Sequence, residues 1–319
     1  MPRERRASVG KAEKTGQTRA TSVAVSDTGR EPSHEAERSK PPAGLYIIAT
    51  PIGNLEDISL RALATLRRVD AVACEDTRVT AKLFARHAIR APLVPYHEHN
   101  AERMRPMLLG RLRRGESVAL VSDAGTPLVS DPGFKLVRAA IAEGLAVTTL
   151  PGASAALAAL VLSGLPSDRF FFGGFLPAKE AARRRALSEL AAVPATLVFF
   201  ESAPRLATAL ADMTAALGDR PAAVARELTK LHEEVRRGAL GELAAHYAAA
   251  GPPRGEVVVV VGPPEKRAAV VSEDAVDAAL RSALAAMSLK DASAAVAATT
   301  GLPRRDIYAR ALLLTGRDK

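Results

Sequence analysis

The sequence predicts an α/β protein with room for two domains. Short apolar runs of strand length recur along the chain, and each ends in a turn of glycine, proline or small polar residues before a helix-like segment begins. This alternation is typical of a sheet whose parallel strands are joined by helices. The 319 residues are more than one core needs, so we expect two α/β domains of medium size.

The first half contains four strands whose carboxyl ends carry its small and polar residues. Because ligands in open α/β sheets bind beyond the carboxyl ends of the strands, we expect the four exits to form one crevice. Helices are expected to follow at residues 59–66, 80–87 and 135–143, with an alanine-rich helix after the fourth exit. The strands are expected at residues 45–49, 71–74, 117–121 and 146–150, and their exits read TPIGN, EDTR, SDAGTP and PGASA.

The exit SDAGTP is the centre of this prediction. Asp123 lies in this exit and Asp131 follows it, and we expect Asp123 to contact a ligand and Asp131, before Pro132-Gly133, to cap a turn. The exit TPIGN matches neither common phosphate-binding motif, and Pro51 removes a backbone donor, so a phosphate loop is disfavoured.

The segment PLVPYHEHN offers two histidines at alternate positions. A strand over residues 93–98 would place His97 and His99 on one face, as a pair of metal ligands or of substrate contacts. No third ligand follows at a suitable spacing, so we expect substrate contact and no metal site.

The second half repeats the alternation with more charge. Strands are expected at residues 196–200, 222–225, 232–237 and 256–261, and the valine-rich alternation of the last two indicates antiparallel pairing. The basic segment 179–185 is either a solvated helix face or a contact for a polyanion. Beyond residue 264 the pattern changes to three short helices, at 276–287, 289–299 and 304–314, a unit of helix-turn-helix size that could dock on RNA or on protein.

Composition limits the class of protein. A hydrophobic content of 48% without a long apolar stretch predicts no membrane span, and a single cysteine, Cys74, excludes an internal disulfide and fits a cytoplasmic protein. The net charge of +9 favours a polyanionic partner such as RNA. Residues 1–43 hold too few large apolar residues to fold and lack the apolar core of a signal peptide, so we expect a disordered basic tail.

The motifs taken together resemble the ribosomal RNA small subunit methyltransferase I family, within the tetrapyrrole-methylase superfamily. The resemblance covers residues 45–261, and SLKDA and TGLPRRDIY near the carboxyl end are similar to the helical extension of that family. The motifs that carry it, in order, are LYIIATPIGNLEDISLRAL, EDTR, YHEHN, VALVSDAGTPLVSDPG, PGASA, SGLPSDRF, FFESAPR and ARELTKLHEE.

The resemblance implies two domains of the tetrapyrrole-methylase type with S-adenosylmethionine in the cleft between them, and 2′-O-methylation of a cytidine ribose in small-subunit (16S) ribosomal RNA. It also implies a homodimer. The expected boundaries are a tail at 1–43, α/β domains at 44–155 and 156–264, and a three-helix extension at 270–317. The residues implied to line the methyl donor are Pro51, Asp123, Ala124, Thr126, Ser154, Ala155, Phe200, Ala225 and Arg226.

A ribose hydroxyl is a poor nucleophile until its proton leaves, so a general base or a cation beside the alkoxide should assist. The sequence does not choose among the candidates, although we expect EDTR and YHEHN to face the RNA. Two other functions stay open, a tetrapyrrole methyltransferase of the same fold and a non-catalytic RNA-binding assembly factor. The principal candidates at strand exits are Glu75, Arg78, His97, Glu201 and Lys230, with Asp76, His99 and Glu227 beside them.

Overall fold

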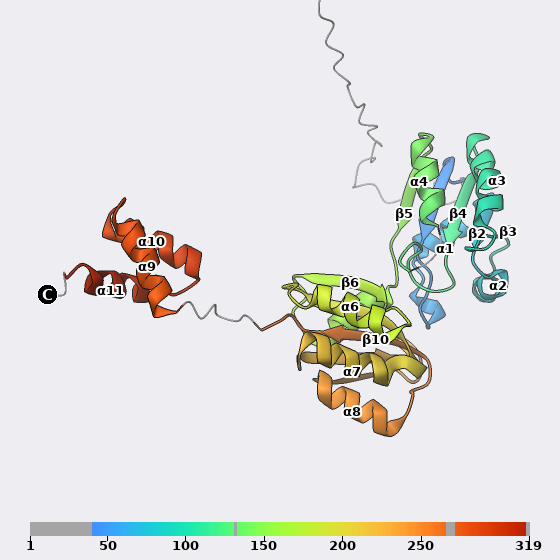
Figure 1. Ribbon diagram of the computed structural model, residues 1–319. Helices are drawn as coiled ribbons and strands as arrows, with labels where there is room; N and C mark the ends of the chain where they lie inside the picture. Colours follow the sequence, from blue (N-terminus) through green and yellow to red (C-terminus); the bar gives the residue numbers. More distant parts are fainter. Residues whose placement is uncertain (1–39, 131–132, 266–271, 317–319) are drawn as a thin grey trace, which may run out of the picture. The chain divides into compact units, whose positions relative to one another are not determined.

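The computed structural model of the chain describes residues 40–130, 133–265 and 272–316. They form two five-stranded sheets with their helices, followed by a group of three helices (Figure 1). Nearly all of the expected tail, as well as Asp131, lies outside the described residues. Within the described part, no helix is both long and apolar enough to span a bilayer.

The first sheet has the strand order β3-β2-β4-β1-β5, and all its neighbouring strands run parallel. The strands are β1 (Gly44–Ile48), β2 (Ala71–Cys74), β3 (Leu93–Pro95), β4 (Ser117–Val121) and β5 (Val147–Leu150). The helices around them are α1 (Leu60–Leu66), α2 (Thr77–Arg86), α3 (Ala101–Arg113) and α4 (Phe134–Ala142), with a short 3-10 turn η1 (Leu55–Asp57).

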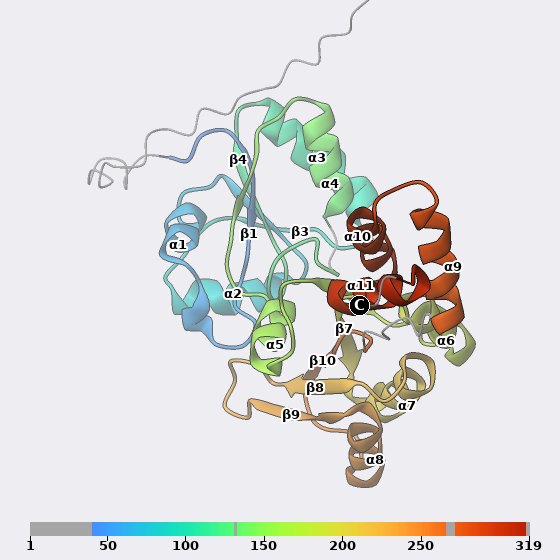
Figure 2. The same ribbon diagram turned by 90° about the vertical axis from the view of Figure 1, so that its left-hand side faces the viewer.

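Side-chain alternation explains why the inner strands β2 and β4 of this sheet are buried on both faces. Val72 and Cys74 of β2 pack in one cluster with α1 and α2, whereas Ala71 and Ala73 pack in another with α3 and α4. Figure 2 shows the two pairs of helices on opposite sides of the strands. A parallel sheet whose strands are joined by helices is the arrangement that the alternation of apolar runs and helix-like segments predicted.

The strand exits meet at one edge of this sheet, as predicted. Cys74 at the end of β2 pairs with Val121 at the end of β4. Beyond β1, Thr50 pairs with Gly125 through two backbone hydrogen bonds, of 2.9 and 3.1 Å. The left-handed backbone of Gly125, with φ of 77°, allows this turn.

The second sheet is mixed, with the order β6-β7-β10-β8-β9. The central strand β10 runs antiparallel to β7 and β8, and β9 runs antiparallel to β8. Both valine-rich strands therefore pair antiparallel, as predicted, although with β8 and not with each other. Strands β6 and β7 run parallel. Its strands are β6 (Phe170–Phe175), β7 (Thr196–Ser202), β8 (Pro221–Arg226), β9 (Glu234–Ala239) and β10 (Glu256–Val261).

The two faces of this sheet are covered by different helices. Helix α5 (Ala155–Ser163) packs on the face that carries Val198 and Val258. Leu197 and Val259, on the opposite face, pack against α6 (Glu180–Leu190), α7 (Leu206–Leu217) and α8 (Leu240–Ala250). A short 3-10 turn, η2 (Ala203–Arg205), joins β7 to α7. The chain passes from the first sheet to the second through the exit PGASA, whose Ser154 caps α5.

Two local predictions for the first sheet were wrong, and helix α9 (Glu273–Leu284) lies three residues before its expected range of 276–287. Helix α2 begins three residues earlier than predicted, because the Asp76 carboxylate accepts the backbone N–H of Arg78 and caps the helix. Strand β3 ends at Pro95, so His97 and His99 lie in a turn that leads into α3, and not on one face of a strand. Backbone pairing with β2 ends with the hydrogen bond from Tyr96 N–H to the Cys74 carbonyl, after which the chain turns and the His97 carbonyl accepts the Asn100 N–H.

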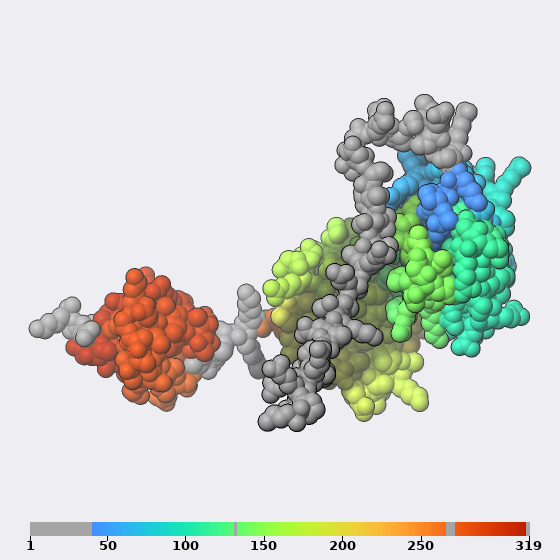
Figure 3. All heavy atoms as spheres, turned by 90° about the horizontal axis from the view of Figure 1, so that it is seen from above, coloured from blue at the N-terminus to red at the C-terminus, as the bar shows by residue number. Residues whose placement is uncertain are grey.

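The last three helices are α9 (Glu273–Leu284), α10 (Leu289–Thr300) and α11 (Arg304–Leu314), which form a compact body with its own core around Leu280 and Ile307 (Figure 3). The Ser288 hydroxyl accepts the backbone N–H of Asp291, as the capping motif predicted. Arg310 of α11 binds Asp277 and Glu273 of α9 at 2.7 and 2.8 Å, so it holds the helices together, while Arg304 and Arg305 are exposed.

Candidate functional site

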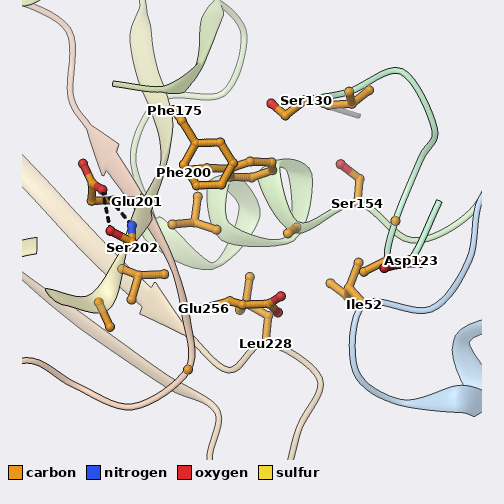
Figure 4. Close-up of a pocket in the computed structure, with 18 of the residues that line it drawn as sticks. Ile52, Asp123, Ser130, Ser154, Phe175, Phe200, Glu201, Ser202, Leu228 and Glu256 are labelled. Atoms are coloured by element: carbon orange, nitrogen blue, oxygen red, sulfur yellow. Dashed lines mark hydrogen bonds between the residues drawn. The ribbon is translucent and has the colours of Figure 1, made fainter. Parts of the chain in front are cut away.

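A cavity of about 540 Å³ lies at the carboxyl edge of the first sheet, and the second sheet supplies its other wall (Figure 4). Asp123 and Ser154 from the exits of β4 and β5 lie on one side, and Glu201 at the end of β7 lies on the other. A cavity of this size can enclose a ligand as large as a nucleoside derivative.

The wall from the first sheet consists of loops tied to one another by hydrogen bonds. The Thr50 hydroxyl donates to the Ser122 carbonyl at 3.1 Å, and the Thr126 hydroxyl donates to the Ala153 carbonyl at 3.3 Å. In the same loop Leu128 and Ser130 adopt positive φ values of 73° and 66°, a conformation that costs free energy in residues other than glycine. The loop is therefore held in a defined shape along the cavity.

Three carboxylates from neighbouring exits gather beside this wall. The backbone N–H of Asp76 donates to Asp123 Oδ1 at 3.0 Å. Arg78 forms an ion pair with Asp76 at 2.6 Å, and its hydrogen bonds lower the pKa of Asp76 to about 2. Burial raises the pKa of Asp123, and burial followed by repulsion from Asp123 raises that of Glu75. Within the described residues neither Glu75 nor Asp123 forms an ion pair, so both keep oxygens free for a ligand or a proton.

His97 follows the end of β3, which pairs with the end of β2 directly before Glu75. Its charge opposes the rise in the Glu75 pKa. Its backbone N–H donates to Asn100 Oδ1 at 2.9 Å, which fixes the turn. The Nδ1 atom of His97 is buried and has no hydrogen-bond partner among the described residues. An imidazole nitrogen without a partner beside a carboxylate of raised pKa can accept or pass on a proton.

The wall from the second sheet is aromatic. Phe200 of β7 makes edge-to-face contacts with Phe172 and Phe175 of β6, with ring centroids 4.9 and 5.5 Å apart. Figure 4 shows the rings of Phe175 and Phe200 next to each other on the cavity wall. Such a surface suits the flat face of a heterocyclic base.

Glu201 is a cavity residue whose carboxylate is already engaged. Its side chain is 0% exposed, and Arg205 donates to both carboxylate oxygens, at 2.8 and 2.9 Å. The backbone N–H of Ser202 adds a third hydrogen bond at 2.7 Å. A buried carboxylate with these partners stabilises the turn from β7 into α7.

Lys230 lies in the loop after β8 and is engaged in the same way. Its Nζ binds Glu227 at 2.9 Å and Glu256, a cavity residue, at 3.0 Å. The loop contacts the exit of β1, where Asn54 N–H donates to Thr229 Oγ1 at 3.0 Å. A side chain at Gly53 would come within 2.5 Å of the Lys230 stem, so the close approach requires glycine.

The residues predicted to line a methyl donor divide into two groups. The donor role of each stays a prediction. Pro51 is buried, and its neighbour Ile52 reaches the cavity instead. Ala225 lies in the core, and Arg226 binds Glu234 at 2.7 Å. The cavity-lining members are Asp123, Ala124, Thr126, Ser154, Ala155 and Phe200.

The sequence did not reveal several residues of the cavity, and neither role predicted for the basic segment 179–185 applies to its Arg183. Ile52, Leu228 and Glu256 line the cavity, but an apolar residue in a loop and an acid at the start of a strand give no distinctive local signal. In the basic segment Arg183 is 5% exposed, and its Nε donates to Asp212 at 2.7 Å. This arginine is therefore neither solvated nor available to a polyanion.

The fold is that of the tetrapyrrole methylases. The family model described as Tetrapyrrole (Corrin/Porphyrin) Methylases matches residues 44–244. Among solved structures, a cobalt precorrin-4 methyltransferase aligns with 68% of this chain and 94% of its own, at 21% identity and a TM-score of 0.52. A diphthine synthase aligns with 68% of this chain and 89% of its own, at 20% identity and a TM-score of 0.53.

Closer relatives narrow this class. A ribosomal RNA small subunit methyltransferase I of Mesorhizobium japonicum is 54% identical over 85% of this chain and 92% of its own length. The protein of that name from Erythrobacter litoralis is 55% identical over 88% and 98%, and that from Escherichia coli O157:H7 is 44% identical over 84% and 94%. A second family model, the RsmI C-terminal HTH domain, matches residues 270–315. The chain belongs to the ribosomal RNA small subunit methyltransferase I family.

Proposed function

We propose that this protein transfers a methyl group from S-adenosylmethionine to the 2′-hydroxyl of a cytidine in small-subunit (16S) ribosomal RNA. Relatives that are 44 to 55% identical over most of both chains carry the name ribosomal RNA small subunit methyltransferase I. The observation that supports the proposal most strongly is the cavity, in which loops from both sheets surround a space fit for a nucleoside-sized donor.

The residues present fit S-adenosylmethionine. Phe175 and Phe200 offer an aromatic surface for the adenine base, and the Ser154 hydroxyl and the backbone of Ala124 offer polar contacts. Asp123, without a cationic partner in the described residues, would attract the positively charged donor. S-adenosylmethionine, when bound, supplies a methyl group on a sulfonium centre, which needs an acceptor oxygen aligned with it.

We assign proton removal from the ribose hydroxyl to the pair Glu75 and His97. His97 offers an unpartnered ring nitrogen, and Glu75 beside it can stabilise the imidazolium that forms. Arg78, whose side chain is 87% exposed, is placed to contact an RNA phosphate, although Asp76 already binds it. Glu201 and Lys230 are assigned to the architecture of the cavity because buried or rim ion pairs engage their charges.

We further propose that the protein works in the cytoplasm as a homodimer. The proposed units are α/β domains at 44–155 and 156–264 and a helical extension at 270–317. Arg304 and Arg305, exposed at the start of α11, support an RNA-docking role for the extension.

Three acceptors incubated with radiolabelled S-adenosylmethionine test this function. We expect label in naked small-subunit ribosomal RNA or in assembled small subunits, at one cytidine, in a linkage that resists alkali because the 2′-oxygen is blocked. Label in uroporphyrinogen alone would instead establish a tetrapyrrole methyltransferase. RNA binding without any transfer would establish a non-catalytic assembly factor.

A further inference from the structure

A second hollow, of about 430 Å³, lies where strand β9 meets the carboxyl end of helix α8. Figure 2 shows these two elements side by side. Three arginines from different segments line it, Arg226 at the end of β8, Arg236 on β9 and Arg254 in the loop before β10. Three guanidinium groups around one concave surface attract an anion.

The local carboxylate does not neutralise this charge. Glu234 is the single acid among the described lining residues. Arg226 Nε donates to it at 2.7 Å, and Arg236 Nη2 lies 3.3 Å from it. The side chain of Arg254 forms no ion pair within the part of the chain that the structure describes. Three positive charges face one negative charge, so the hollow keeps an excess positive charge.

The arginines do not serve to cap the neighbouring helix. Helix α8 ends at Ala250, where cationic side chains often bind the last carbonyl groups. Among the described residues, none of the three arginines donates to a carbonyl of α8; Arg226 Nη1 instead reaches the Arg254 carbonyl at 3.5 Å. Arg226 and Arg236 share Glu234, so the groups available to a ligand are the Arg254 side chain and the remaining guanidinium N–H groups of the other two arginines.

Two short segments of the chain, residues 226–228 and 254–255, contribute both to the hollow and to the cavity described above. Arg226 lines the hollow and Leu228 the cavity, while Arg254 lines the hollow and Gly255 the cavity. A nucleic acid strand with its target ribose at the cavity would carry its neighbouring phosphates past the hollow. We propose that this hollow binds the phosphodiester backbone of the RNA next to the methylated nucleotide, an inference that rests on the proposed function.

Two single variants of the full-length chain, Arg236→Gln and Arg254→Gln, test this site. Both side chains are exposed, so neither change should unfold the protein. Binding to a fluorescent small-subunit ribosomal RNA transcript and to unmethylated small subunits is measured at several salt concentrations. Each variant should weaken binding about tenfold and reduce the slope of log affinity against log salt by about 0.7. Calorimetry should show unchanged affinity for S-adenosylmethionine.

The matched control is Arg61→Gln, which removes one exposed charge from α1 and should change neither affinity nor slope. Wild-type affinity and slope in both hollow variants would overturn the proposal. Loss of inorganic phosphate binding without loss of RNA binding would also overturn it, because the hollow would then hold a free anion. Failure of the proposed function is a separate result, in which the wild-type protein itself transfers no methyl group to RNA.

Discussion

Carboxylates at the edge of the first sheet differ from those beside the second sheet in the groups that they face. Burial raises the pKa values of Glu75 and Asp123, and neither carboxylate forms an ion pair within the residues that the structure describes. Hydrogen bonds from Lys230 and Arg226 lower the pKa values of Glu227 and Glu234. The first pair is free to bind and to exchange protons, while the second pair stabilises the fold.

The cause of the difference is visible in the strand exits. ESAPR and RELTK each contain an acid and a base three or four residues apart, and Glu201 with Arg205 and Glu227 with Lys230 pair within the loop. SDAGTP contains an acid and no base, and in EDTR the single arginine binds Asp76. The composition of each loop thus decides whether its carboxylate is engaged.

The largest effect is expected on the methylation rate when His97, at the carboxyl edge of the first sheet, is replaced. His97→Ala should lower the methylation rate by about a hundredfold or more, because a general base is lost. Donor affinity should persist, because His97 is not among the residues that line the cavity. Single-turnover methylation and calorimetry measure the two quantities. Glu98→Gln, an exposed change in the same turn, is the control, and loss of the thermal unfolding transition in His97→Ala would make His97 structural.

At the second sheet, replacing the buried carboxylate of Glu201 should affect stability instead of the methylation rate. Glu201→Gln leaves the Arg205 guanidinium without its buried partner and should lower the free energy of unfolding by about 3 kcal/mol. Chemical denaturation measures this free energy, and Glu189→Gln, an exposed change in α6 without an ion pair among the described residues, is the control. A variant of normal stability without transferase activity would contradict the structural role and make Glu201 catalytic.

The next effect is expected on donor binding, which we assign to Asp123 at the edge of the first sheet. Asp123→Ala should weaken S-adenosylmethionine binding about tenfold, because a carboxylate facing a cationic ligand is removed. Asp57→Ala, in the exposed turn η1, is the matched control for calorimetry. Equal affinity in a folded Asp123 variant would remove this residue from the donor site.

The smallest expected effect is a pair of opposite pH dependences. The raised pKa of Asp123 means that the folded state binds the proton more tightly, so its charge costs stability above the folded pKa. Asp123→Asn should therefore raise the melting temperature slightly at pH 7, with the gain vanishing below about pH 4.

Glu227 should behave in the opposite way. Its lowered pKa contributes stability that is present above about pH 4 and is lost as the pH falls through the folded value. Glu227→Gln should therefore lower the melting temperature at pH 7 and have no effect in strong acid. The same sign of change in both variants would contradict the comparison.

The sequence predicted the first sheet well because its signals are local. Apolar runs followed by glycine or small polar residues located all four exits, and parallel pairing then required them to meet. The predicted capping of α10 by Ser288 also depends on residues close in sequence.

Features that depend on distant contacts could not be predicted. The burial of Arg183 depends on Asp212, which lies on another helix. Leu128 and Ser130 take positive φ values that their residue types do not indicate. Strand β3 ends earlier than predicted because the chain turns after Tyr96, where Asn100 Oδ1 accepts the His97 backbone N–H.

A crystal structure with S-adenosylhomocysteine tests the central claim most directly. The account predicts this compound in the cavity, with contacts to Asp123 and Ser154 from one sheet and to Phe200 from the other. A compound bound elsewhere, with residues 122–127 untouched, would contradict the assignment of the donor site to the edge of the first sheet.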